Sequence, residues 1–342
     1  MKSIVFAAAA AVATASHEAE WETFKSTYKT EGYATANEEA SRFATFQANM
    51  VKADALTKLE DGRAFFGVTK FMDLTPEEFK QYLGYRPVSD TTAIKELDIR
   101  CVRRSLIAVA APRSPLTFLH PPRSEMVDSQ AANGPAKIDW SGNLTTPVKD
   151  QQQCGSCWAF SATEQIETMY IKSGAGKTSD TLSVQQIVSC DKKDQGCNGG
   201  DTPTAYASVI AAKGIESGEA YPYTSGKGKT AKCAFNDHKP VITDISGFSY
   251  VGKSNETAMA AYVGQSAPLS ICVDATSWQS YVSGLVGPKT CKKQLDHCVQ
   301  VVGYDMSKTR YKYNYWVVRN SWNTDWGEKG FIFVSMGYHV SW

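Results

Sequence analysis

Three features are absent or scarce in the sequence: a long apolar segment, a strong net charge and histidine. Beyond the N-terminus no segment has about 18 uninterrupted apolar residues, so no transmembrane anchor is predicted. The formal net charge is only +1, which argues against nucleic acid or an anionic membrane as the main partner. The chain has just five histidines, so few residues compete for any role that needs an imidazole.

Cysteine, by contrast, is abundant. The chain has nine cysteines, clustered after Cys154, which is many for a cytosolic protein and indicates disulfides. The N-terminus agrees, because a short basic start is followed by an apolar run over 4–12 and small residues over 13–15. We interpret residues 1–15 as a secretory signal peptide.

The most informative segment is QQQCGSCWAF, residues 151–160. Cys157 is followed by a tryptophan and an apolar run, which predicts that a helix begins there. The positive end of the helix dipole stabilises a thiolate at this place, which lowers the thiol pKa and makes the sulfur a nucleophile. CGSCW resembles the signature of papain and the cathepsins, in which a histidine and an asparagine follow downstream. The chain has His297 in LDHCVQVVGY and Asn320 in VVRNSWNTDWGE, in that order.

The resemblance to papain-like cysteine peptidases implies a role for each of these residues. Cys157 is expected to be the nucleophile, and His297 the base that forms an ion pair with it and later protonates the leaving amine. Asn320 is expected to orient the imidazole, with Trp322 covering the hydrogen bond between them. Gln151 and the backbone N–H of Cys157 are expected to form the oxyanion hole.

Two acidic residues near these positions are assigned more modest roles. Asp296, next to His297, either tunes the charge of the catalytic pair or only caps a strand. Glu167, on the same predicted helix as Cys157, is interpreted as a buried structural carboxylate.

The spacing of Cys154 and Cys157 also fits two other chemistries. C-x-x-C occurs in thioredoxin-type redox sites and forms half of many zinc sites. A redox site is expected to follow an apolar strand, but the preceding residues here are KDQQQ. Zinc needs a second ligand pair, and Cys190 and Cys197 are spaced too widely for the usual knuckle. We therefore predict neither a metal nor a cofactor.

Residues 16–85 are interpreted as a small, helical, inhibitory prodomain. Apolar residues recur at helical spacing from about residue 18 to 58. Residues 67–73 resemble a second propeptide motif, and the Thr-Pro-Glu-Glu run over 75–78 predicts a capped helix start. Four residues resemble the long-helix motif of cathepsin-L-type propeptides: Glu38, Arg42, Phe46 and Asn49.

Residues 86–133 have the composition of a linker, with repeated prolines and no lasting period. The stretch is longer than the usual junction in the family that the chain resembles. Two hypotheses remain open: retained non-coding sequence in the gene model, or a long, cleavable activation loop. Sequencing the transcript distinguishes them.

Residues 134–342 predict an α+β domain. A short helix is expected over 182–188, and strands are expected from residue 241 onward, in VITDISGF, LSICVDA, CVQVVGYD, YNYWVVRN and GFIFVSM. A helical half followed by a β half resembles the two-lobed papain fold, with a helical left lobe and a barrel-like right lobe. The chain stops soon after the last of these segments, so we expect the right lobe to be short at its C-terminus.

The resemblance also implies a disulfide framework. It pairs Cys154 with Cys197 and Cys190 with Cys233. Cys272 and Cys298 replace small apolar residues on neighbouring predicted strands, and we predict that they bond to each other, which requires Cα atoms within about 4.4–6.8 Å. Two cysteines then remain free: Cys101 and Cys291.

A specificity pocket is expected where relatives bind the substrate residue called P2. A leucine wall with one carboxylate at the rim predicts a preference for an apolar residue and tolerance of a basic one. The residues assigned to substrate binding are Gly199, Gly200, Asp201, Thr202, Cys272, Leu295 and Cys298.

These features predict a secreted or lysosome-like cysteine endopeptidase made as a zymogen. The prodomain is expected to lie through the cleft in reverse direction and to be removed at acid pH. We expect polypeptide substrates, the chain's own propeptide as inhibitor, and a monomer without nucleic acid. An alternative from another class is a catalytically silent, secreted binding or inhibitory protein that keeps the propeptide-like domain.

Overall fold

The computed structural model describes residues 17–87, 134–236, 239–242, 245, 247–251, 255–290 and 294–337. The predicted signal peptide, nearly all of the 86–133 junction, and both Cys101 and Cys291 lie outside the described residues. No helix in the described part is long and apolar enough to cross a membrane.

The N-terminal part is helical, as the spacing of its apolar residues predicts. A helix over 17–28 packs against the long helix α2 (Ala36–Leu59) through the buried rings of Trp21, Phe24 and Phe46, which lie 5.2–5.3 Å apart. The predicted capping box is present at α3 (Pro76–Phe79), where the Thr75 side chain accepts from the backbone of the third helical residue. A 3₁₀ turn, η1 (Lys80–Tyr82), follows α3.

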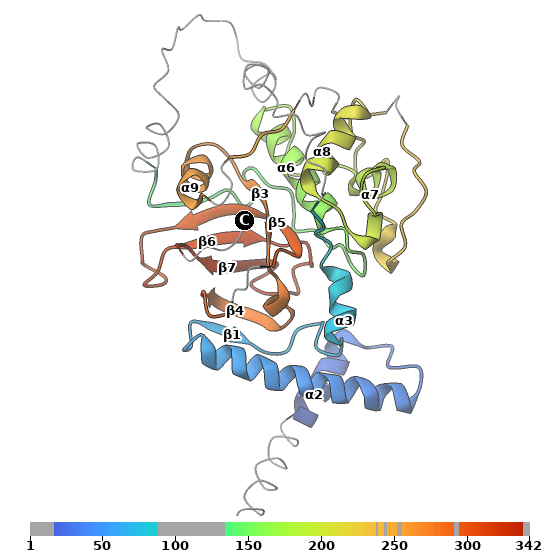
Figure 1. Cartoon of the computed structure of the whole chain (residues 1–342), viewed down its shortest axis with the longest axis vertical. Helices are drawn as coiled ribbons and strands as arrows, with labels where there is room; N and C mark the ends of the chain where they lie inside the picture. Colours follow the sequence, from blue (N-terminus) through green and yellow to red (C-terminus); the bar gives the residue numbers. More distant parts are fainter. Residues whose placement is uncertain are drawn as a thin grey trace, which may run out of the picture.

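Among the described residues, the helical lobe of the enzyme domain contains three α-helices. They are α6 (Cys157–Lys172), α7 (Val184–Cys190) and α8 (Thr202–Ala211), with a 3₁₀ turn η3 (Gly196–Asn198) between the last two. The predicted short helix is α7, and it begins two residues later than expected because Ser183 caps it through the backbone N–H of Gln186. In Figure 1 these helices gather on one side of the molecule.

The second lobe is a mixed sheet whose edge strand, β1 (Ala64–Phe66), comes from the prodomain; the strand order is β1-β4-β7-β6-β5-β2, and β3 pairs with β5. Its strands are β2 (Lys137–Asp139), β3 (Leu269–Val273), β4 (Tyr281–Val286), β5 (His297–Asp305), β6 (Tyr315–Arg319) and β7 (Phe331–Ser335). Helix α9 (Glu256–Gln265) packs beside β5. The described strands form an open sheet, so the second lobe is not a closed barrel in this part of the chain.

One predicted strand is wrong. The segment 241–248 alternates apolar and polar residues, but its described residues form no strand, and Ile242 makes only an isolated bridge with Ile215. Alternation alone does not make a strand where no neighbouring strand supplies a ladder of hydrogen bonds.

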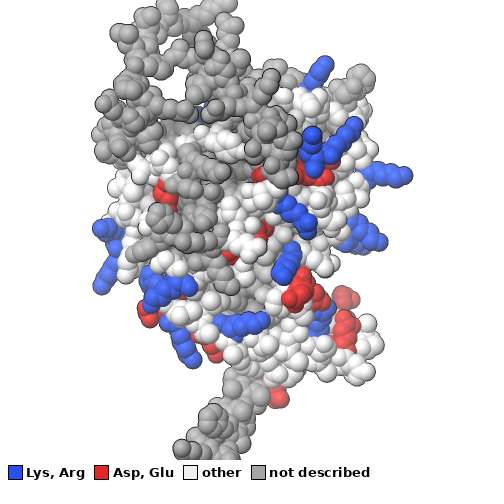
Figure 2. Space-filling model, in the orientation of Figure 1, with Lys and Arg blue, Asp and Glu red and all other residues white. Residues whose placement is uncertain are grey.

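The prodomain extends the enzyme's sheet. Its strand β1 (Ala64–Phe66) pairs antiparallel with β4, and α2 lies along the outer side of β1. Beyond α3 the chain rises between the helical lobe and the sheet (Figure 1). On the face drawn in Figure 2, acidic and basic side chains are scattered over both parts among the coloured residues. Two ion pairs between described residues also join the prodomain to the enzyme: Lys70 with Asp325 at 2.9 Å, and Asp61 with Lys289 at 2.8 Å.

The two lobes meet at the N-terminus of α6. Ser161 on this helix donates to the carbonyl of Val299 at 2.7 Å and lies 2.6 Å from the hydroxyl of Ser270, so the helix is tied to β5 and β3. The first residue of α6 and the first residue of β5 consequently face the same boundary. These two residues are Cys157 and His297.

Candidate active site

Cys157 is the first residue of α6, as the sequence predicts. Its side chain is fully buried, and it is the one free cysteine in the described part of the chain. The backbone N–H of Gly84, in the prodomain, donates a hydrogen bond to its Sγ atom at 3.3 Å. The sulfur is thus positioned at a helix start but is covered.

His297 begins β5 and is paired with Asn320. Nε2 of the histidine lies 2.7 Å from Oδ1 of the asparagine, which also accepts from the backbone N–H of Ser321 at 2.8 Å. Because Oδ1 is an acceptor, the proton of the neutral imidazole resides on Nε2, and Nδ1 carries a lone pair. Nδ1 is buried and has no hydrogen-bond partner among the described residues.

Aromatic rings enclose this pair. The ring centroid of His297 lies 4.7 Å from that of Trp322 and 6.0 Å from that of Trp278. The prodomain adds Phe71 and Phe79, whose rings lie 5.2 and 5.5 Å from that of Trp322. These rings therefore keep water from the hydrogen bond between the histidine and the asparagine. Trp322 lies where the sequence predicts, over this hydrogen bond.

Gln151 is held on both sides of its amide group. Its Oε1 accepts from the hydroxyl of Ser321 at 2.8 Å, and its backbone N–H donates to the carbonyl of Ser321 at 2.9 Å. Its Nε2 then donates to the carbonyls of Cys154, at 2.9 Å, and of Tyr82 in the prodomain, at 3.0 Å. The Tyr82 carbonyl of the prodomain thus accepts a hydrogen bond from the amide that the sequence analysis expects to bind the oxyanion.

Burial makes both members of the expected ion pair neutral. Loss of solvation raises the pKa of the Cys157 thiol to about 12, although backbone N–H donors of Cys298 and Gly84 oppose the rise. Burial also lowers the pKa of His297 to about 4, against the effect of its hydrogen bond to Asn320. With the prodomain in place the thiol pKa is therefore raised and not lowered as the sequence predicts, and desolvation is the largest cause.

The prodomain crosses the site as an extended strand. The backbone N–H of Tyr85 donates to Asp296, that of Arg86 donates to Gly200, and that of Gly200 donates to Gly84, each at 2.9 Å. The bridge between Tyr85 and Gly200 is parallel. A Cβ atom on Gly84 would collide with the carbonyl of Gly155, so this crossing requires a glycine.

Three disulfides lie in the described residues: Cys154–Cys197, Cys190–Cys233 and Cys272–Cys298. In the last, the two residues are directly opposite on β3 and β5, with Cα atoms 3.9 Å apart, closer than the range expected from the sequence. Because Cys154 is bonded to Cys197, it forms no redox pair with Cys157, and no group of three metal-ligating side chains occurs among the described residues.

The residues expected to bind substrate lie around the prodomain's Tyr85. Gly200 pairs with its backbone, and Asp201 is the N-cap residue of α8, which begins at Thr202. Burial raises the pKa of the Tyr85 phenol to about 12, with a further rise from the charge of Asp201. Its side chain packs against the same buried cluster that contains Cys157 and Cys298 and that Cys272 borders. Gly199 precedes Gly200 in the chain, and Leu295 precedes Asp296, whose carbonyl accepts from the backbone N–H of Tyr85.

The two neighbouring carboxylates differ in what they contact. Asp296 accepts from the backbone N–H of Ala275 at 2.8 Å and from the hydroxyl of Thr276, and burial raises its pKa to about 6. Its charge also contributes to the raised pKa of the Cys157 thiol. Glu167 is fully buried, accepts from the backbone N–H of Leu182 at 2.7 Å and pairs with Lys149 at 3.0 Å. Its contacts are those of a structural carboxylate.

Sequence reasoning missed three residues around this site. Gly84 covers the thiol, Ser321 holds Gln151, and Tyr223 contacts the loop before Cys157. Ser321 could have been suspected because it follows Asn320 directly. Neither Gly84 nor Tyr223 carries a local signal, since each reaches the site from a distant part of the chain.

The fold and the site define a two-lobed protein with a buried Cys–His–Asn arrangement and an N-terminal domain lying across it. Residues 134–341 match the papain family cysteine protease, and residues 21–79 match the cathepsin propeptide inhibitor domain (I29). The chain therefore belongs to the papain family of cysteine proteases. It is a cysteine-type peptidase made as a proenzyme, with its propeptide as an intramolecular inhibitor.

Individual relatives agree with this assignment. Cysteine proteinase B of Leishmania mexicana is 36% identical over 345 residues, which covers 98% of this chain and 71% of that protein. Cysteine proteinase 1 of Dictyostelium discoideum is 35% identical over 317 residues, covering 88% and 83%. The structure of the digestive procathepsin L2 proteinase from the larval midgut of Tenebrio molitor has a TM-score of 0.74 at 30% identity, covering 95% of this chain and 96% of that one.

Proposed function

We propose that the mature domain is an endopeptidase in which Cys157 is the nucleophile, His297 the general base and acid, and Asn320 the residue that orients the imidazole. One observation carries this proposal. A peptide backbone already lies in the site, with the Tyr82 carbonyl on Nε2 of Gln151 and the Gly84 N–H on the thiol sulfur. The groups that would handle a substrate backbone are occupied by the chain's own propeptide.

The proposed reaction begins when the prodomain leaves and solvent reaches the sulfur. The thiol proton passes to Nδ1 of His297, and the thiolate attacks the carbonyl carbon of the scissile bond. The resulting oxyanion accepts hydrogen bonds from Nε2 of Gln151 and the backbone N–H of Cys157. The imidazolium then protonates the amine, which leaves as the new N-terminus. Water, deprotonated by the imidazole, hydrolyses the thioester and restores the thiol.

Processing and location are part of the same proposal. We propose that residues 16–85 are removed as the inhibitory segment, with cleavage in the 86–133 junction, and that the enzyme works in a secretory or lysosome-like compartment. The three disulfides support an oxidising route. We further propose a monomer that binds no nucleic acid, for which size-exclusion chromatography with light scattering is the test.

The proposed specificity pocket is the space around Tyr85. Its walls are Gly199, Gly200, Asp201 and Thr202 on the helical lobe, and Cys272, Leu295 and Cys298 on the other. The mainly apolar lining favours an apolar or aromatic substrate residue, and Asp201 at the rim favours a basic residue over an acidic one. A peptide library that varies this one position tests the order: apolar and aromatic first, basic next, acidic last.

Peptide hydrolysis tests the proposed activity. The proenzyme, the same protein after acid treatment, and a Cys157→Ala variant treated identically are compared on an unstructured polypeptide. We expect internal cleavage only by the acid-treated wild type. The alternative of a silent binding protein predicts no cleavage by any form. Cleavage by the Cys157→Ala variant would show that Cys157 is not the nucleophile.

A further inference from the structure

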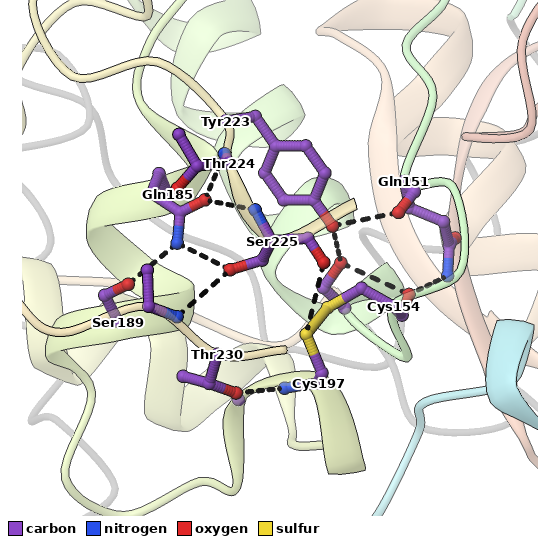
Figure 3. Close-up of a disulfide and its surroundings, with 12 residues drawn as sticks. Gln151, Cys154, Gln185, Ser189, Cys197, Tyr223, Thr224, Ser225 and Thr230 are labelled. Carbon is purple, nitrogen blue, oxygen red and sulfur yellow. Dashed lines mark hydrogen bonds between the residues drawn. A yellow bond between two sulfur atoms is a disulfide. The ribbon is translucent and has the colours of Figure 1, made fainter. Parts of the chain in front are cut away.

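The hydroxyl of Tyr223 joins the two ends of the loop that precedes Cys157. It donates to the backbone carbonyl of Gln151 at 2.9 Å (Figure 3) and lies 2.9 Å from the hydroxyl of Ser156. Gln151 carries the proposed oxyanion donor, and Ser156 is the N-cap residue of α6, next to the nucleophile. One oxygen atom therefore touches both segments whose spacing defines the oxyanion hole.

The direction of these hydrogen bonds follows from counting protons. A tyrosine hydroxyl has one proton, and here the Gln151 carbonyl accepts it. In the contact with Ser156 the serine is then the donor and the phenol oxygen the acceptor, since the other acceptor within reach of the serine proton, the Cys154 carbonyl, is farther away at 3.4 Å. Burial raises the pKa of the Tyr223 phenol, so the hydroxyl stays protonated and the arrangement does not change across the working pH range.

Tyr223 is itself held rigidly. The backbone N–H groups of the next two residues, Thr224 and Ser225, donate to Oε1 of Gln185 at 2.6 and 3.0 Å. Gln185 lies fully buried on α7, and its Nε2 donates to the hydroxyls of Ser189 and Ser225 (Figure 3). The tyrosine ring packs edge-on against Phe160 of α6 at 5.0 Å. The hydroxyl is thus fixed from α7 and from α6 together.

The loop that it joins needs such a support. Gln152 has a positive φ of 51°, which is unusual for a residue with a side chain, so the backbone next to Gln151 is held in a less favoured conformation. The Cys154–Cys197 disulfide anchors the middle of the loop (Figure 3). The Tyr223 hydroxyl anchors its ends, where the disulfide does not act.

We propose that Tyr223 is a positioning residue that sets the distance between the Gln151 amide and the backbone N–H of Cys157. The inference rests on the proposed function of these two groups. Without the hydroxyl, the carbonyl of buried Gln151 loses its donor and the loop relaxes. The loss falls on the tetrahedral intermediate, whose oxyanion needs both donors in place, and not on the binding of the rest of the peptide.

The test compares acid-activated wild type with Tyr223→Phe, which keeps the ring against Phe160 and removes only the hydroxyl. Tyr304→Phe is the matched control, because its hydroxyl donates a partly buried hydrogen bond of similar length, 3.0 Å, to the carbonyl of Pro135 on another part of the domain. We expect Tyr223→Phe to lower kcat about tenfold with KM changed less than about twofold. A peptide aldehyde, which forms a tetrahedral adduct with the thiol, should bind about tenfold more weakly.

Three results overturn the proposal. They are an unchanged kcat and aldehyde affinity in Tyr223→Phe, an equal loss in Tyr304→Phe, or a rise in KM without a fall in kcat. If Tyr223→Phe does not fold, Ser156→Ala replaces it and should show the same split between kcat and KM. Failure of the wild type to cleave peptide contradicts the proposed function instead, so the two failures are distinguishable.

Discussion

The backbone N–H of Gly84 donates a hydrogen bond to the sulfur of Cys157, at 3.3 Å, across the boundary between prodomain and enzyme. The contact lies on a fully buried thiol, whose loss of solvation raises its pKa to about 12, although the hydrogen bond from Gly84 itself opposes the rise. Latency in this proenzyme thus has two components: the cleft is filled, and the nucleophile is kept in its unreactive, protonated form.

Replacing Gly84 by alanine should weaken latency. The added Cβ collides with the carbonyl of Gly155, and backbone on both sides is fixed by hydrogen bonds, so the prodomain strand must shift. A forced contact of this kind costs about 1–3 kcal/mol. We expect a thiol-directed epoxide to label intact Gly84→Ala proenzyme about tenfold faster or more at pH 7. Gln81→Ala, an exposed neighbour, serves as control, and equal rates in both variants would argue against the strand as the cover.

Thiol reactivity should report the raised pKa directly. In the proenzyme, the rate of alkylation by iodoacetamide should keep rising with pH up to the onset of alkaline unfolding, because the fraction of thiolate increases toward a pKa of about 12. The mature enzyme should instead react below neutral pH. A plateau in the proenzyme profile below pH 9 would contradict the account.

His297 should make the proenzyme less stable in acid. Its folded pKa is about 4 and lies below its usual value, so between about pH 6.5 and 4 the unfolded chain binds more protons and stability falls as pH falls. Buried Glu164, with a pKa raised to about 7, opposes this trend. The difference in Tm between wild type and His297→Gln, measured from pH 7 to 4, isolates the contribution of the histidine. The Tm of the wild type should fall relative to that of the variant as the pH falls.

Asn320→Ala should lower kcat with little change in KM. The substitution removes the acceptor 2.7 Å from Nε2 of His297 and frees the imidazole to rotate away from the thiol. We expect a loss of about tenfold or more in steady-state hydrolysis by the mature enzyme. An Asn320→Gln variant that recovered full activity would indicate that only an amide nearby, and not the fixed geometry, is needed.

The Cys272–Cys298 disulfide should affect both stability and substrate choice. It closes a loop with a sequence separation of 26, so its removal should cost about 3 kcal/mol of stability. In the proposed pocket, a Cys272→Ala/Cys298→Ala variant should accept a larger aromatic residue relative to leucine. The ratio of kcat/KM for two matched peptides checks this, and an unchanged ratio with a lowered Tm would leave the disulfide a purely structural role.

Local patterns predicted the parts of the molecule that local chemistry determines. The capping box at α3, the start of α6 at Cys157 and the strand predicted from Cys298, which begins one residue earlier at His297, follow from neighbouring residues. The segment 241–248 failed because strand formation depends on a partner that is distant in sequence. The prediction of a lowered thiol pKa did not hold in the proenzyme for the same reason, since Gly84, which contacts the thiol, lies 73 positions away in the sequence.

Active-site mapping of Cys157 before and after prodomain removal tests the central claim most directly. A thiol-directed epoxide is added to intact proenzyme and to acid-activated enzyme at one pH, and the labelled peptide is identified by mass spectrometry. We predict about one adduct per molecule, on the peptide containing Cys157, after activation only. Equal labelling of both forms, or an adduct on any other residue, would contradict a prodomain that keeps this thiol covered and protonated.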